Sequence, residues 1–252
     1  MNKIYDVKND SYAHRKRFLY IKSKIDSYPK EDPKILDVGC GSGLLLNLPL
    51  AENGYDITGI DLDQTSIDFL NKVNTFKNAK YFKRRIEECD LQTFDIVIIS
   101  EVLEHLDHPG EALQEIRKRM NDDSMLIVTI PNGYGCFEIE KAIVSIFWWI
   151  PFTKKILLRI KKWEQRKKLS TPITLNATDK HVQHFTLSAM RNLLIKNGFQ
   201  IVEQRNVSLL GGPISDRTWG RIKFLLPVSE KLGDIFPSCI ANGWYFILKK
   251  IN

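Results

Sequence analysis

The chain has 252 residues, of which 43% are hydrophobic and 27% charged, the balance of a soluble globular protein with one sizeable domain and an insertion. Its four cysteines form no Cys-x-x-Cys pair, which argues against a disulfide scaffold or zinc ribbon and favours a reduced, cytoplasmic protein. The formal net charge of +7 is carried by residues 154–168, so we expect one basic patch and no nucleic-acid partner.

Residues 1–33 are expected to be a helical lead-in that ends before Pro29 and Pro33. Strands and helices then alternate, which predicts an α/β fold with a Rossmann-like, doubly wound, mostly parallel seven-stranded sheet. The strands of this first part are predicted at residues 34–38, 56–60, 79–83, 94–99 and 124–130, and its helices at 43–53, 63–73 and 109–120.

The alternation stops after residue 135, which defines a core of residues 34–135. Residues 136–180 are rich first in large apolar residues and then in Lys and Arg, and we interpret them as an α-helical insertion. Residues 181–252 return to the sheet, with a helix over 187–197 that Thr186 caps and Gly198 ends. Strands over 199–203 and 244–249 complete the prediction.

A glycine turn follows the first predicted strand. Asp37 lies in that strand, and Gly39, Cys40, Gly41 and Gly43 form the turn. Glycines at alternate positions let the backbone pass close to a ligand without Cβ clashes. We expect a helix to begin near Gly43, with its free N–H groups towards the ligand. The Gly-x-Gly-x-Gly spacing differs from the Gly-x-Gly-x-x-Gly fingerprint of NAD sites.

Asp61 ends the second predicted strand, a little over 20 residues after the glycine turn. An acid in this position can accept hydrogen bonds from a ribose diol. The alternative is that Asp61 caps the following helix. Asp63 is better placed for that role, which leaves Asp61 for a ligand.

The segment after the fourth strand carries two carboxylates and an imidazole, in Glu101, Glu104 and His105. Ligands of such sheets bind outside the carboxyl ends of the strands, so this loop belongs to the binding edge. The residue types suit acid–base or metal chemistry. Alternatively, the two glutamates cap the chain before Pro109, and His105 packs against a ligand.

Two further histidines, His181 and His184, lie where the chain returns to the sheet. Their spacing suits a metal site, but there is no cysteine cluster or third ligand close by in the sequence. We favour a role for one of them in a substrate pocket, with plain loop packing as the alternative.

Together these motifs resemble the class I S-adenosylmethionine (SAM)-dependent methyltransferases, in particular the branch with ubiquinone-pathway O-methyltransferases and glycan-cluster methyltransferases. The resemblance covers residues 34 to 199 and rests on the segments Leu36–Gly43, Gly59–Asp61, Phe94–Val97, Glu101–His105, Thr129–Asn132, His181–Thr186 and Gly198–Phe199.

The resemblance implies that the backbone of the glycine turn lies along the methionine part of SAM and that Asp61 holds the ribose. It places Leu62 beside the adenine and directs the Ser100 carbonyl to the amino group. In some quinone methyltransferases the residues matching Glu101, Glu104 and His105 bind a divalent cation, which suggests Mg²⁺ here.

One position departs from the family pattern. Relatives usually carry an acidic or polar residue after the third strand, where this chain has Arg84 and Arg85. The backbone of Arg85 and Ile86 is then expected to contact the adenine.

The insertion indicates the substrate class. Ala142–Thr153 carries no charge but is too short to span a bilayer. Trp148 and Trp149 precede the basic run Lys154–Lys168, a pattern typical of interfacial membrane contact, while a helical lid is equally compatible. We therefore expect O-methylation of a lipid, quinone or lipid-linked glycan by a cytoplasmic enzyme, peripheral on the inner face of the membrane.

In this hypothesis His105 is the base and Glu104 orients it. Methylation of a soluble metabolite, or SAM binding without catalysis in a regulatory protein, are the alternatives.

Overall fold

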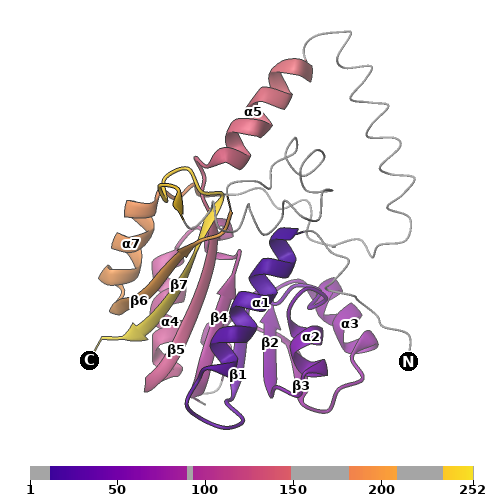
Figure 1. The fold of residues 1–252 in the computed structure, drawn as a ribbon. Helices are drawn as coiled ribbons and strands as arrows, with labels where there is room; N and C mark the ends of the chain where they lie inside the picture. The colour runs from indigo at the N-terminus through magenta and orange to yellow at the C-terminus, as the bar shows by residue number, and fades with distance from the viewer. Residues whose placement is uncertain (1–11, 90–92, 149–181, 209–234, 252) are drawn as a thin grey trace.

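The computed structural model describes residues 12–89, 93–148, 182–208 and 235–251. Seven strands form one sheet in the order β3-β2-β1-β4-β5-β7-β6 (Figure 1). The first five strands are parallel, and β7 runs antiparallel between β5 and β6. The strands are β1 (Ile35–Val38), β2 (Ile57–Asp61), β3 (Ala79–Lys83), β4 (Phe94–Ser100), β5 (Met120–Pro131), β6 (Phe199–Asn206) and β7 (Gly243–Lys250).

Helices cover both faces of the sheet, as the doubly wound prediction requires. The helices are α1 (Tyr12–Asp26), α2 (Asn47–Glu52), α3 (Gln64–Val73), α4 (Pro109–Lys118), α5 (Cys136–Trp148) and α7 (Leu187–Lys196). One core lies between the sheet and α1, α2 and α3, and the other between the sheet and α4 and α7. β4 is buried on both faces because helices cover both, which explains its unbroken apolar run.

The predicted elements are confirmed, with shifted boundaries. Asp63 caps α3 by accepting hydrogen bonds from the backbone N–H groups of Thr65 and Ser66, and Thr186 caps α7. β5 begins four residues earlier than predicted because Met120 pairs with Phe94 across the sheet. The C-terminal strand β6 continues to Asn206 because it pairs with β7 along that length.

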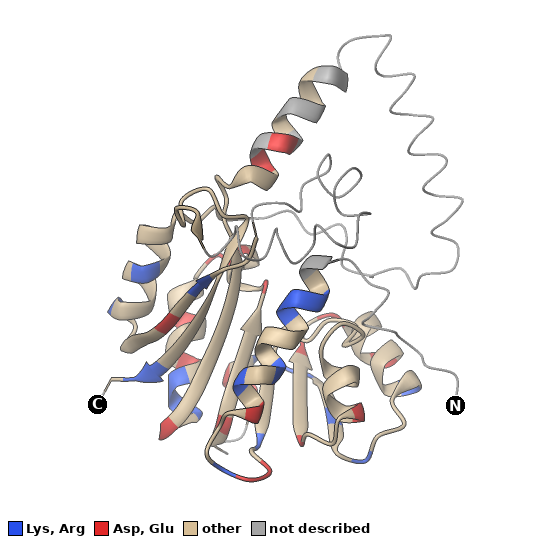
Figure 2. Cartoon of the chain, in the orientation of Figure 1, with Lys and Arg blue, Asp and Glu red and all other residues tan. Residues whose placement is uncertain are grey.

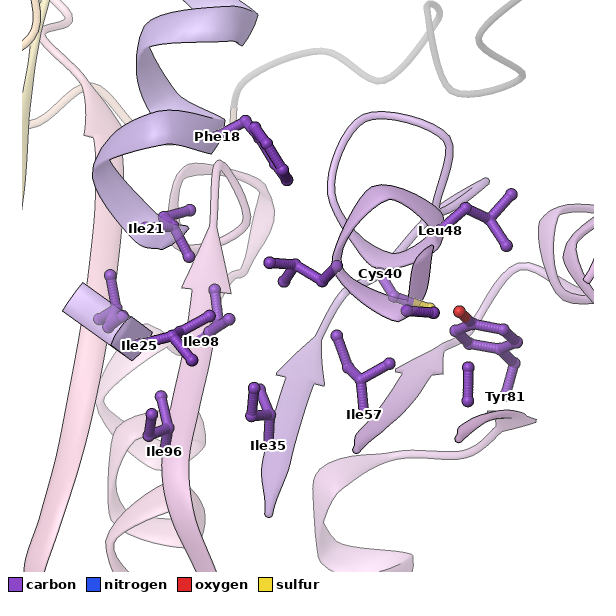
Figure 3. Packing of buried hydrophobic residues seen from close by; sticks show 14 of the residues in the cluster. Phe18, Ile21, Ile25, Ile35, Cys40, Leu48, Ile57, Tyr81, Ile96 and Ile98 are labelled. Atoms are coloured by element: carbon purple, nitrogen blue, oxygen red, sulfur yellow. The ribbon is translucent and has the colours of Figure 1, made fainter. Parts of the chain in front are cut away.

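The N-terminal helix α1 packs across the middle of the sheet. Figure 3 shows Ile21 and Ile25 of this helix against Ile96 and Ile98 of β4. The Tyr20 ring stacks on Tyr245 of β7 at a centroid distance of 4.7 Å.

Polar contacts add a second attachment of α1 to the sheet. The Tyr20 hydroxyl donates to Glu203 of β6 at 3.3 Å, and Lys24 forms an ion pair with the same carboxylate. Lys and Arg residues run along this helix (Figure 2). α1 is therefore fixed to the C-terminal strands on one side and reaches the carboxyl ends of the parallel strands on the other.

Of the predicted insertion, the structure describes the part that forms α5, which extends away from the sheet (Figure 1). Within the described ranges, none of the helices has the length and apolar character needed to cross a bilayer. Trp149 and the basic run lie outside the described residues.

Candidate active site

A cavity of about 570 Å³ opens at the carboxyl ends of β1, β2 and β4. Seven of the predicted site residues line it: Gly39, Asp61, Leu62, Arg85, Ile86, Glu101 and His105. The remaining lining residues are Val38, Ile60, Arg84, Glu87, Val102, Leu106, Asp107, His108, Glu111 and Ala112. Segments predicted separately to face a ligand therefore share one cavity.

The glycine turn has backbone conformations that other residues rarely adopt. Gly39, Gly41 and Gly43 have φ of +77°, +51° and +63°. A Cβ on Gly39 would lie 2.4 Å from Cγ2 of Val102, so glycine is required at this position. The left-handed conformations also interrupt right-handed helix, and the prediction of a helix from residue 43 is wrong: α2 begins at Asn47. Gly39, the first residue of the turn, lines the cavity, and no residue of α2 does.

Asp61 connects this turn to the next helix. One carboxylate oxygen accepts the Gly41 N–H at 2.7 Å, and the other accepts the Asp63 N–H at 2.8 Å. Asp63 caps α3 as predicted, and Asp61 in addition holds the glycine turn. Each carboxylate oxygen can accept a second hydrogen bond, so the residue can support the turn and still receive a diol.

Replacing Asp61 with alanine is expected to weaken SAM binding at least tenfold, since hydrogen bonds to a charged group contribute about 1.5–3 kcal/mol each. Calorimetry on the variant measures this. Asp56→Ala, an exposed aspartate just before the same strand, serves as the control and should bind as the wild type does. Equal affinity in Asp61→Ala would show that the residue is only structural.

Asp37 lies behind the turn rather than on the cavity wall. Its side chain is 2% exposed, and one oxygen accepts a 2.8 Å hydrogen bond from the Asn47 side chain. Burial raises the pKa of Asp37 from its usual 3.8 to about 7. The predicted cofactor residue Asp37 thus packs the turn against α2 and has no direct access to the cavity.

This burial predicts a pH dependence of stability. The unfolded chain ionises Asp37 near pH 3.8 but the folded chain near 7, so the wild type loses stability as pH rises between these values. Asp37→Asn carries no such charge, and its melting temperature relative to the wild type should rise by roughly 3 °C or more from pH 4 to pH 7.

Asp95→Asn is a control in which the stability difference from the wild type should change with pH in the opposite direction. Burial alone would raise the pKa of Asp95, but hydrogen bonds from Lys30 and from the Lys34 N–H outweigh it and lower the pKa. Relative to the wild type, this variant should lose stability as pH rises from well below 3.8 to just above it, and the difference should then stay constant up to pH 7. A constant difference between Asp37→Asn and the wild type at all pH values would contradict the buried-acid interpretation.

The loop after β4 begins with a left-handed residue. Glu101 has φ of +56°, an unusual conformation for a residue with a side chain. Its carboxylate accepts a hydrogen bond from the Thr129 hydroxyl at 2.9 Å and lies 3.6 Å from the Arg17 guanidinium of α1. Ser100 shares a hydrogen bond with the same threonine at 2.9 Å. The contribution of Arg17 was missed, because no local pattern connects this helix to the loop.

Glu104 and His105 are neighbours in the next turn, the 3₁₀ segment η3 (Leu103–His105). Glu104 is 1% exposed, and its carboxylate oxygens accept no hydrogen bond within the described residues. Burial and the nearby charge of Glu101 raise the pKa of Glu104 to about 8. The His105 Nε2 lies 3.9 Å from a Glu104 oxygen, and His105 itself lines the cavity. This is the arrangement of an imidazole supported by a buried carboxyl group.

Arg84, Arg85 and Ile86 line the cavity beyond Asp61, as expected for this segment. The Arg84 guanidinium lies 5.0 Å from the Phe82 ring centroid, and the Arg84 N–H donates to the Asp61 carbonyl at 3.2 Å. Leu62, 56% exposed, is at the cavity edge. The Arg85 N–H donates to the Glu88 carboxylate at 3.1 Å, and the carbonyls of Arg85 and Ile86 accept the N–H groups of Glu88 and Cys89, each at 3.2 Å.

The structure does not bring every predicted residue to the cavity. Cys40, Gly41, Gly43 and Ser100 are not among its lining residues. His184 packs instead against Gly133 after β5, and its ring lies 6.4 Å from that of Tyr134. His181 lies outside the described residues.

The implied Mg²⁺ ligands do not form a metal site as arranged. In the part of the chain that the structure describes, no three His, Cys, Asp or Glu side chains gather in a metal-binding group. Glu101 is engaged with Thr129 and Arg17, and Glu104 is buried beneath His105.

The charge of the cavity suits a positively charged ligand. Asp61, Glu87, Glu101, Asp107 and Glu111 line it against Arg84 and Arg85. SAM carries a sulfonium charge and fits this balance, while the backbone of the glycine turn leaves room for a ligand beside Val38 and Gly39.

The topology and this site together define the class I SAM-dependent methyltransferase fold. The structure is similar to a magnesium protoporphyrin IX methyltransferase from Synechocystis with bound S-adenosylhomocysteine (SAH), with a TM-score of 0.59 at 13% identity over 94% of this chain and 84% of that one. A Methanosarcina mazei SAM-dependent methyltransferase aligns with a TM-score of 0.54 at 19% identity, covering 90% of this chain and 97% of that one.

The chain belongs to a methyltransferase domain family whose model matches residues 12–204. It is 36% identical over 142 residues to a ubiquinone biosynthesis O-methyltransferase of Rickettsia bellii, covering 54% of this chain and 59% of that protein. A protein of the same name from Bartonella tribocorum is 26% identical over 227 residues, covering 82% of this chain and 78% of that protein. The chain thus spans well under two thirds of the length of the Rickettsia relative.

Proposed function

We propose that the protein is a SAM-dependent methyltransferase that methylates an oxygen of a quinone-type or other lipid-linked acceptor. The observation that carries the proposal is the shared cavity, which Gly39 of the glycine turn, Asp61 and His105 all line. SAM supplies an electrophilic methyl group when bound. The glycine turn and Asp61 would hold it, with the backbone of Arg85 and Ile86 beside the adenine.

His105 is the proposed general base. It lines the cavity beside the buried Glu104, whose carboxyl group would orient the imidazole that takes the acceptor's hydroxyl proton. The remaining task of the protein is to bring the acceptor oxygen in line with the methyl group, which proximity and orientation accomplish.

An apolar acceptor is supported by the exposed surface near this edge. Tyr134, in the loop after β5, and Val182, beside Glu104, are 62% and 56% exposed. Relatives named for ubiquinone biosynthesis support a phenolic acceptor with an apolar tail.

The test is SAH release by purified protein given SAM and either a short catechol or the same catechol with a prenyl chain in detergent micelles. The proposal predicts faster turnover of the prenylated catechol. Preference for the short catechol would favour a soluble metabolite. Tight SAH binding with no turnover of either would favour a regulatory SAM-binding protein.

We further propose peripheral contact with anionic membrane on the cytoplasmic side, through Trp148, Trp149 and the Lys154–Lys168 run. Flotation with anionic vesicles should recover the protein at 0.1 M salt and lose it at 1 M, where the Debye length falls from about 10 Å to about 3 Å. A Trp148→Ser/Trp149→Ser variant should float less. Protein that stays unbound at low salt would favour the lid alternative.

A further inference from the structure

Residues 182–185, the return arm, re-enter the described fold against the loop that follows β4. The backbone N–H groups of Val182 and Gln183 both donate to the Glu104 carbonyl at 3.0 Å. The Gln183 side-chain amide donates to the Leu106 carbonyl at 2.8 Å and the Asp107 carbonyl at 3.0 Å. Four hydrogen bonds therefore join the arm to residues 104–107.

The arm is held on its other side by the loop after β5. The Gly133 N–H donates to the Phe185 carbonyl at 3.3 Å, and the Phe185 side chain is 7% exposed in the core. A Cβ on Gly133 would lie 2.6 Å from the His184 Cβ, so the two segments are in close contact. The arm is thus anchored independently of the loop that it holds.

The loop held by the arm is the wall of the cavity. His105, Leu106 and Asp107 all line it. Within the loop, the His105 N–H donates to the Val102 carbonyl at 2.9 Å and the Leu106 N–H to the Leu103 carbonyl at 3.4 Å. A single 3₁₀ turn of this kind has little stability of its own, so the wall depends on outside contacts, namely the burial of Leu103 in the core and the hydrogen bonds from the arm.

We propose that Gln183 is a positioning residue that sets the place of His105 and the adjoining cavity wall. A substitution can remove the hydrogen bonds of its side chain without changing the backbone of the arm. The inference rests on the proposed function in one respect, namely that the cavity binds SAM.

The proposal has a reciprocal consequence. If the arm orders the cavity wall for the ligand, then a ligand in the cavity must stabilise the arm by the same free energy. The amides of Val182 and Gln183 report this directly, because both donate to the Glu104 carbonyl. Their hydrogen exchange should slow when SAH is bound.

Two variants test the side chain. Gln183→Met keeps its length but has no donor, and Gln183→Glu keeps its shape but places a carboxylate against two carbonyl oxygens. Both should weaken SAH binding roughly ten- to thirtyfold, the loss expected for two hydrogen bonds. Both should speed hydrogen exchange in residues 104–107 and lower kcat more than they raise KM for the prenylated catechol.

Gln114→Met is the matched control. The Gln114 side-chain amide donates to Asn197 at 3.3 Å, away from the loop. This variant should resemble the wild type in SAH affinity and in exchange of residues 104–107, with a similar melting temperature to Gln183→Met. SAH affinity and loop exchange within twofold of the wild type in both Gln183 variants would overturn the proposal.

A wrong proposed function and a wrong positioning role for Gln183 give different results. If the wild type itself does not bind SAH, the assignment of the cavity fails. Faster exchange of residues 104–107 in Gln183→Met than in Gln114→Met would then still support the positioning role, and equal exchange would overturn it.

Discussion

Gly39→Ala is expected to weaken SAH binding by at least about a hundredfold, the combined effect of backbone strain and a displaced cavity wall. Gly39 has φ of +77°, and an added Cβ would lie 2.4 Å from Val102, which itself lines the cavity. Either the turn or Val102 must move, and both face the ligand. Calorimetry with SAH measures the loss, and circular dichroism checks that the variant is folded.

Gly54→Ala is the control that distinguishes the effect of backbone strain from damage to the SAH site. Gly54 has φ of +94°, and an added Cβ would meet no atom within 4 Å. This variant should lose stability but keep its SAH affinity. If Gly39→Ala does not fold, adding Val102→Ala removes the clash while leaving the new methyl group at the turn. Wild-type affinity in a folded Gly39→Ala protein would refute the assignment of the glycine turn.

His105→Gln is expected to lower kcat by a factor of about 10² or more, the usual contribution of a positioned general base. Glutamine retains hydrogen-bonding capacity but cannot take a proton near neutral pH. SAH affinity should change little, because the loss concerns the reaction rather than cofactor binding. Turnover of the prenylated catechol and SAH calorimetry provide the two measurements.

His108→Gln is the control for this variant, since His108 lines the same cavity. It should leave kcat within a few fold of the wild type. Comparable losses of kcat in His105→Gln and His108→Gln would mean that both histidines only support the cavity wall. Full turnover in His105→Gln would remove His105 from the chemistry.

The sequence predicts most of the fold because its signals are local. The strand and helix patterns locate the elements to within a few residues, and the caps at Asp63 and Thr186 are confirmed. The glycine turn and Asp61 also lie where the motif predicts them, since parallel strands bring their carboxyl ends to one edge.

The remainder of the site depends on contacts between distant segments. Arg17 reaches Glu101 from a helix whose own pattern does not indicate a partner, and Gln183 reaches the carbonyls of Leu106 and Asp107 across the cavity loop. The start of α2 was misplaced because the left-handed conformation of Gly43 cannot be distinguished in the sequence from a helix beginning. Asp37 was assigned to the cofactor, but its burial depends on packing against Asn47.

The attachment of α1 to the C-terminal strands has a consequence for biosynthesis. Glu203, which accepts a hydrogen bond from Tyr20, lies 183 positions later in the chain. During translation, α1 leaves the ribosome long before β6 and β7 exist, so its apolar face has no complete binding surface until they have been made. Because Arg17 of that helix lies 3.6 Å from Glu101, the contact between α1 and the loop after β4 becomes stable only after β6 and β7 have been made. A nascent chain that lacks these two strands would therefore leave part of the apolar face of α1 uncovered.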